Sequence, residues 1–82
     1  MKKLEYNGQR NICGELVRLE RLKKRISQEK LAARLQVRGV NMEQNAISSI
    51  ERGDRLVTDY ELWAFAVVLE VPMESLINPE QP

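Results

Sequence analysis

Histidine is absent from this 82-residue sequence, and cysteine occurs only once, as Cys13. The first absence removes the commonest general base and the commonest metal ligand of proteins. One cysteine without histidine makes neither a thiol-protease site nor a zinc site, and it cannot form an internal disulfide. We therefore predict that the protein is not an enzyme and has no metal site and no cofactor. We interpret Cys13 as a partly buried small apolar residue rather than a redox switch.

Long apolar runs are also missing, because the longest extends only from Ala64 to Leu69, which is too short to span a membrane. The N-terminal residues are polar where a secretory signal would need an apolar segment. Aromatic residues make up only 5% of the chain, so aliphatic side chains must supply most of the core. We expect one small cytoplasmic domain, the size that 82 residues permit.

Charge is nearly balanced overall, with a net of +1, but it is unevenly distributed. Residues 18–38 contain eight bases and two acids, whereas residues 56–82 contain five acids and no base. A chain polarised in this way can approach a polyanion with one end and keep the other end away from it. The simpler alternative is that surface helices carry their charges in blocks.

Apolar spacing and capping residues predict an all-α fold with five helices and no strand. A first helix, from about Asn11 to Lys24 or Arg25, would bury a stripe with steps of three and four: Ile12, Leu16, Leu19, Leu22 and Ile26. Ser27 caps a second helix, which Gly39 can end. Its buried face would consist of Leu31, Ala32 and Leu35.

The third helix would follow Asn41, which with Gln44 could form a capping box, or would start one or two residues later. It would end at Gly53. A fourth helix would begin at Thr58 and bury Leu62, Phe65, Ala66 and Leu69; Pro72 would start a short fifth helix that ends near Ile77. We expect residues 1–10, which contain an Asn-Gly turn signal, to form a flexible arm. Residues 11–78 would form the folded domain, and residues 79–82 a frayed tail.

The outward face of the predicted third helix carries short polar side chains where lysine and glutamate are the ordinary choice: Gln44, Asn45, Ser48 and Ser49, followed by Arg52. Amide side chains match the donor and acceptor pair of adenine in the major groove, and serines permit close approach. Two short helices, the second with such a face, are typical of a helix-turn-helix. The alternative is a surface helix that is merely solvated.

Three segments carry a family resemblance: SQEKLAARL, AISSIERG and TDYELWAFAVVLEVPMESLI. They resemble the helix-turn-helix of the Cro and phage-repressor family, also called lambda-repressor-like or Xre domains, over about Ile12 to Ile77. The resemblance implies that bases are read by Gln44, Asn45, Ser48 and Ser49. It also implies that Gln28 faces DNA, that Arg52 and Arg55 approach the DNA backbone, and that Arg21 pairs with Glu51 to hold the recognition helix at its angle. From the residues themselves, Gln28 is expected to contact the DNA backbone with its amide and with the free N–H groups at the start of the second helix. Further contacts with the DNA backbone are expected on the basic face of that helix, at Lys30 and Arg34.

The sequence departs from the family pattern in three places. The connection between the second and third helices is longer than the family's tight turn. Gln36 stands where the turn glycine is usual, so that Gly39 takes over its role. Glu20 occupies a position that is usually apolar. Either the first helix is rotated toward Leu19 and Leu22, or Glu20 pairs with a nearby base.

Trp63 and Val67 lie four residues apart, on a face of the fourth helix that the core stripe leaves partly open. They are a candidate dimer surface, because members of the family often dimerise through their C-terminal helices and two-fold operators favour dimers. The alternative is that both side chains complete a small core.

We predict a sequence-specific DNA-binding transcriptional regulator, a repressor that occupies its promoter as a homodimer on double-stranded DNA. It needs no small-molecule substrate. Replacing Gln44 or Asn45 should relax sequence preference, whereas replacing Arg55 should weaken binding to all sites alike. The alternative is the same fold used as a protein-binding module, an antitoxin or an adaptor, with the acidic C-terminal half as its working surface. An unrelated small hydrolase is disfavoured by the absence of histidine.

Overall fold

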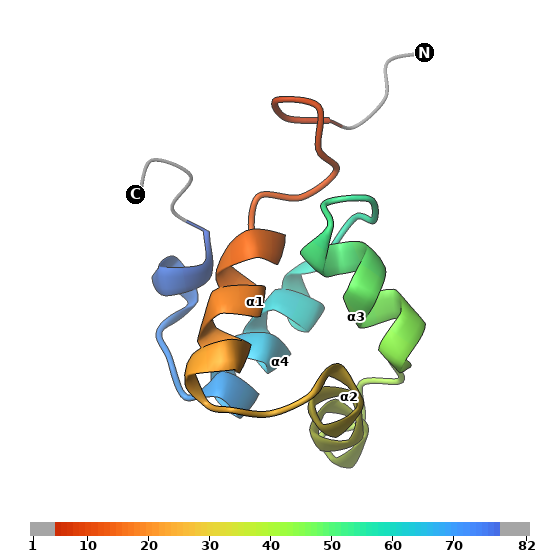
Figure 1. Cartoon of the computed structure of the whole chain (residues 1–82), viewed down its shortest axis with the longest axis vertical. Coiled ribbons are helices and arrows are strands. Elements are labelled where there is room, and N and C mark those ends of the chain that lie inside the picture. The colour runs from red at the N-terminus through yellow and green to blue at the C-terminus, as the bar shows by residue number, and fades with distance from the viewer. Residues whose placement is uncertain (1–4, 78–82) are drawn as a thin grey trace.

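The computed structural model describes residues 5–77. Within them lie four α-helices and one 3-10 turn, with these bounds: α1 Gly14–Lys23, α2 Gln28–Val37, α3 Gln44–Glu51, α4 Asp59–Leu69 and η1 Met73–Leu76. The α1 and α4 helices run beside each other, α2 crosses below them, and α3 lies on the opposite side from η1 (Figure 1). The predicted all-α class is confirmed for the described residues, but the expected fifth helix is only the 3-10 turn.

The core lies where α1, α2, α3 and α4 converge, and Phe65 is the only aromatic side chain among its fully buried members. Aliphatic residues and one methionine from the helices and loops fill the remaining space: Val17, Leu31, Leu35, Met42, Ile47, Ile50, Leu69 and Leu76. Burial of this kind stabilises the fold by roughly 25 cal/mol for each Å² of apolar surface removed from water. No helix of residues 5–77 is long and apolar enough to cross a membrane.

The face that α1 buries differs from the predicted stripe. Leu19 and Leu22 are 41% and 47% exposed, whereas Val17 and Arg21 are buried. Glu20 pairs with Lys23 at 3.3 Å, so pairing with a base is the alternative that holds for this residue. The choice of buried face has a tertiary cause, because the first turn of α1 lies directly against the backbone of α3.

The start of α1 also differs from the expectation. The helix begins at Gly14 and not near Asn11, with Cys13 at the N-cap position. Asn11 still contacts the start of the helix, because its side-chain oxygen accepts a hydrogen bond from the Gly14 N–H at 2.8 Å. Its amide nitrogen donates to the carbonyls of Ile50 and Arg55 at 3.0 and 2.8 Å. One side chain therefore joins the start of α1 to the end of α3.

The connection between α2 and α3, residues 38–43, is anchored to the protein. Val40 and Met42 are buried, and the Gln36 amide donates to the Met42 carbonyl at 3.2 Å. Gly39 has the left-handed backbone expected of it, with φ +84°. The suggested capping box of Asn41 and Gln44 is wrong, because the N-cap of α3 is Glu43, whose side chain makes no capping hydrogen bond.

The capping box of α4 is confirmed: the Thr58 hydroxyl accepts from the Glu61 N–H, and the Glu61 carboxylate accepts from the Thr58 N–H. Residues 6–9, expected in a loose arm, instead form a hydrogen-bonded turn in which Tyr6 and Gln9 pair. The Arg10 N–H then donates to the Gly53 carbonyl at 2.8 Å. The predicted frayed tail and the first four residues of the predicted arm lie outside the described residues.

Cys13 is buried, as the sequence suggested for a small apolar residue. Burial raises the pKa of its thiol to about 11, so the reactive thiolate is scarce at neutral pH. We expect the folded protein to resist alkylation by iodoacetamide at pH 7.5, and the urea-unfolded chain to react fully. Mass spectrometry of the two samples measures this difference, and rapid labelling of the folded protein would contradict it.

Candidate nucleic-acid interface

The ion pair that the resemblance implies is present between α1 and the last turn of α3. Arg21 donates from Nε and Nη2 to the two carboxylate oxygens of Glu51, at 2.7 and 3.0 Å. Its third nitrogen, Nη1, donates to the Ile26 carbonyl at 2.9 Å. Both residues are buried, and the hydrogen bonds that Arg21 donates to Glu51 raise the pKa of Arg21. This two-pronged pair joins the last turn of α3 to α1.

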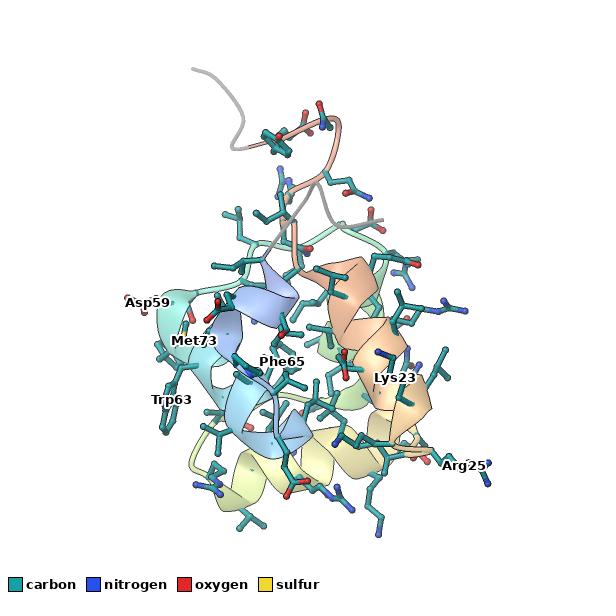
Figure 2. The ribbon with its side chains drawn as sticks, turned by 90° about the vertical axis from the view of Figure 1, so that its left-hand side faces the viewer. Lys23, Arg25, Asp59, Trp63, Phe65 and Met73 are labelled. Carbon is teal, nitrogen blue, oxygen red and sulfur yellow. The ribbon has the colours of Figure 1, made fainter. Side chains whose placement is uncertain are left out.

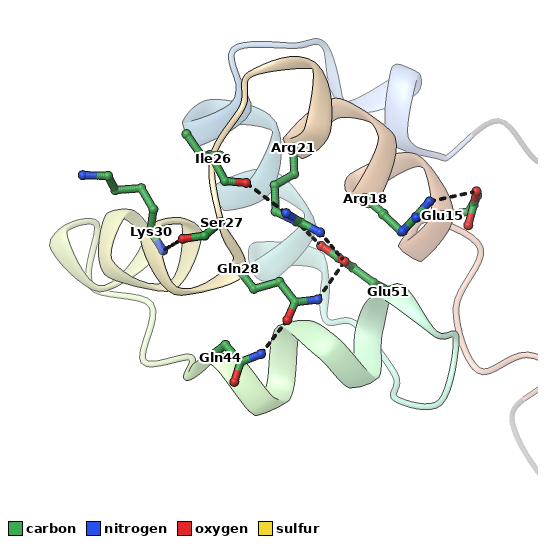
Figure 3. A network of polar contacts seen from close by, with 9 residues as sticks. All are labelled: Glu15, Arg18, Arg21, Ile26, Ser27, Gln28, Lys30, Gln44 and Glu51. Atoms are coloured by element: carbon green, nitrogen blue, oxygen red, sulfur yellow. Dashed lines mark hydrogen bonds and ion pairs between the residues drawn. The ribbon is translucent and has the colours of Figure 1, made fainter.

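The same carboxylate reaches the outer surface through two glutamines (Figure 3). Gln28, the first residue of α2, donates its amide to Glu51 at 2.9 Å. The Gln28 oxygen accepts from the Gln44 amide, on the first turn of α3, at 2.5 Å. The chain Arg21–Glu51–Gln28–Gln44 thus connects a buried ion pair to two polar side chains that were predicted separately to face DNA.

The remaining predicted base-reading residues lie on α3 as expected, with Asn45 exposed and Ser48 and Ser49 partly exposed. Arg52 folds back over both serines, because its Nη1 donates to the Ser48 hydroxyl at 2.6 Å and its Nη2 to Ser49 at 3.4 Å. Its Nε donates to Asp54 at 3.1 Å. The exposed face of α3 therefore includes this guanidinium together with the serines.

The residues that were predicted to contact the DNA backbone do not all lie on one surface. Lys30 is exposed on the first turns of α2, where its backbone N–H donates to the Ser27 cap. Arg34 instead lies beside α4, in a groove that it shares with Val67 and Val68. Arg55 is held in the loop, because its guanidinium donates to both carboxylate oxygens of Glu61 at 3.0 and 3.1 Å and to the Leu56 carbonyl.

Arg55 and Glu61 form an internal pair that sequence reasoning missed. Burial works to raise the pKa of Glu61, but the Arg55 guanidinium and the Thr58 N–H and hydroxyl outweigh it and lower the pKa. The carboxylate is therefore ionised in the folded protein and serves α4 as a cap. The T-x-x-E spacing signalled the cap, but no sequence signal identified Arg55 as its partner.

Sequence reasoning also missed the contacts that two residues make with the end of α3. Asn11 had been assigned only to the start of the first helix, yet it bonds to the end of α3. Gly14 had no role, yet a Cβ there would lie 1.9 Å from the Ile50 carbonyl oxygen. Both contacts join residues more than 30 positions apart, so no local pattern could have revealed them.

Comparison with known proteins identifies the family of the chain. A family model described as helix-turn-helix, of the Cro/C1 type, matches residues 17–76. The chain belongs to this family, and the resemblance drawn from its motifs is confirmed. It is a family of DNA-binding transcription regulators. No curated protein matches the chain, and no solved structure does.

Proposed function

We propose that the protein is a sequence-specific transcriptional repressor that places α3 in the major groove and occupies its operator as a homodimer. The major groove admits one α-helix. The observation that supports this function best is the hydrogen-bonded chain from Arg21 through Glu51 and Gln28 to Gln44. A surface helix that is merely solvated has no need of a buried ion pair to orient its first polar residue.

The proposed contacts fall into two kinds. Gln44, Asn45, Ser48 and Ser49 would read base edges, since they share the exposed side of α3 and have side chains of matching chemistry. Phosphates would be bound by Lys30 and Arg52, and by Gln28 together with the free N–H groups at the start of α2. Arg55 is the weakest candidate for a phosphate contact, because Glu61 already holds its guanidinium.

The connection of residues 38–43 is proposed to be a lengthened form of the family's turn. Its two buried side chains, Val40 and Met42, give the added residues a fixed path. The start of α3 then keeps its place beside Gln28 in spite of the longer connection. Such a path would allow a lengthened turn to leave the proposed position of α3 unchanged.

Selection of binding sites from random duplexes tests this function. We expect a palindromic motif. Gln44→Ala and Asn45→Ala should each lose about 1–3 kcal/mol of discrimination at particular base pairs. Lys30→Ala is the matched control: it should weaken all sequences alike and reduce the slope of log K against log salt by about one. Arg55→Ala would be a poor control, because it also removes the partner of Glu61.

Two results would contradict the proposal. One is that Gln44→Ala and Asn45→Ala, like Lys30→Ala, lower the affinity for all DNA sequences equally, which would exclude direct readout by α3. The other is enrichment of no motif, which would favour the second candidate function, a protein-binding antitoxin or adaptor. That second function is supported by the exposed aromatic residues Tyr60 and Trp63, which lie in the acidic C-terminal half.

A further inference from the structure

The guanidinium of Arg52 lies over the exposed face of α3. Its Nη1 donates to the Ser48 hydroxyl at 2.6 Å and its Nη2 to the Ser49 hydroxyl at 3.4 Å. A helical side chain leans over the turn that precedes its own Cα, so the charged group lies beside residues that were predicted to read bases. The Arg52 side chain is 60% exposed, whereas both serines are only partly exposed. The guanidinium is therefore the more accessible polar group on this part of the face.

Asp54 holds the same guanidinium from the end of the helix. Its carboxylate accepts from the Arg52 Nε at 3.1 Å. Its backbone N–H donates to the Ser49 carbonyl at 2.9 Å, and the Gly53 N–H donates to the Ile50 carbonyl at 2.9 Å. Gly53 has φ +80°, as this type of helix ending requires. Three acceptors on three residues thus fix the plane of the guanidinium.

The position of Asp54 argues against a phosphate contact for Arg52. The Asp54 side chain is 64% exposed, so a guanidinium brought against a phosphate would carry this negative charge toward the DNA backbone. Like charges opposed in this way weaken binding. The O6 and N7 atoms of guanine are uncharged acceptors that suit a planar fork of donors. Each terminal nitrogen of Arg52 has a second N–H, which the contacts with the two serines leave available for such a fork.

We propose that Arg52 reads a guanine in the major groove by donating to its O6 and N7 atoms. Ser48, Ser49 and Asp54 are then positioning residues that hold the guanidinium toward the base. The proposal rests on the proposed function, and it moves Arg52 from the phosphate contacts to the base contacts. The amides of Gln44, on the same helix, match adenine, so the operator half-site contains a guanine as well as adenine.

The candidate dimer surface lies elsewhere on the molecule. Trp63 is 48% exposed and its ring points out of the bundle, whereas Phe65 lies inside it (Figure 2); Trp63 therefore does not complete the core. Val67 is partly exposed one helical turn further along α4. Since α3 packs on α1 and α2, pairing of two copies at Trp63 and Val67 would leave the Arg52 guanidinium accessible to DNA.

Selection of binding sites with matched variants tests the guanine contact. We expect a guanine at one position of each half-site. Arg52→Ala should lower the preference for guanine there by at least about fivefold and leave the positions read by Gln44 and Asn45 unchanged. Lys30→Ala is the matched control, because loss of a phosphate contact weakens binding to all sequences alike and keeps the guanine preference.

The positioning residues are tested at the same base pair. Ser48→Ala and Asp54→Asn should each lower the guanine preference by a smaller factor than Arg52→Ala. Combined with Arg52→Ala, neither should cause a further loss, because each acts only through the guanidinium. If Arg52 bound a phosphate instead, Asp54→Asn would raise the affinity for every sequence and leave the preference unchanged. All three side chains are at least partly exposed, so circular dichroism should show the same folded protein.

Modified bases identify the atoms that are read. Replacing the guanine with 7-deazaguanine removes the N7 acceptor, whereas hypoxanthine keeps N7 and O6 and lacks only the minor-groove amino group. We expect 7-deazaguanine to lower the affinity of the wild-type protein by at least about fivefold, and hypoxanthine to change it little. The Arg52→Ala variant should bind the three duplexes alike. Fluorescence anisotropy of labelled duplexes measures these affinities.

Three outcomes would overturn the proposal: an equal loss for every sequence with Arg52→Ala, a selected motif without a guanine that depends on Arg52, or full affinity of the wild-type protein for the 7-deazaguanine duplex. In each case a motif is still selected, so the proposed function stands. Selection of no motif at all would refute the proposed function, and the guanine contact with it.

Discussion

Gly14→Ala is expected to destabilise the protein by at least about 3 kcal/mol, although alanine is the better helix former by about 1 kcal/mol. The added Cβ would lie 1.9 Å from the Ile50 carbonyl oxygen and 2.9 Å from the side-chain oxygen of Asn11. Neither neighbour can move freely, because the Asn11 amide itself donates to that carbonyl. Relief requires α1 and α3 to separate, so urea denaturation should show the loss, and affinity for operator DNA should fall with it.

A second glycine provides the control. Gly39 has φ +84° and open space around the position of a Cβ, so Gly39→Ala should cost only the left-handed penalty of about 1–2 kcal/mol. The exposed replacement Arg18→Ala, on the same helix as Gly14, should be nearly neutral. Equal losses at Gly14 and Gly39 would show that the close approach of α1 to α3 is wrong.

Breaking the buried ion pair should have an effect of similar size. Arg21→Ala or Glu51→Ala leaves an uncompensated buried charge and should cost about 3–5 kcal/mol. A domain of this length has a total stability of roughly 4–12 kcal/mol, so either variant should lose a large fraction of it and unfold at a markedly lower temperature. Thermal unfolding followed by circular dichroism measures the loss. The pair Arg18–Glu15, 3.9 Å apart and largely exposed, is the matched control and should give a small change.

The double variant Arg21→Met, Glu51→Leu separates stability from orientation. Replacing both charges with apolar side chains often restores stability. It also removes the acceptor that holds the Gln28 amide, so Gln28 and Gln44 should lose their fixed positions. We expect a folded protein with weakened discrimination between operator sequences. Full specificity in a stable double variant would show that the ion pair has no orienting role.

The sequence by itself determined the all-α class of the fold, the existence of the four α-helices and the family. Periodicity of three and four located the four α-helices, and local capping at Ser27 and Thr58 fixed two of their starts. These features depend on neighbours within one helical turn, so they can be recognised without tertiary information. Gln28 and Gln44 were assigned to DNA contacts from their places at the starts of two helices, from their amide side chains and from the family resemblance.

Only the tertiary structure decided which face of α1 is buried, where the arginines point and how α3 is held. Leu19 and Leu22 satisfy an amphipathic pattern, yet they are exposed because Gly14 brings α1 onto the backbone of α3. Arg55 looks like any basic loop residue until Glu61 is placed beside it. Such contacts join residues that the chain separates, and their energies depend on burial and distance, which no local pattern of residues encodes.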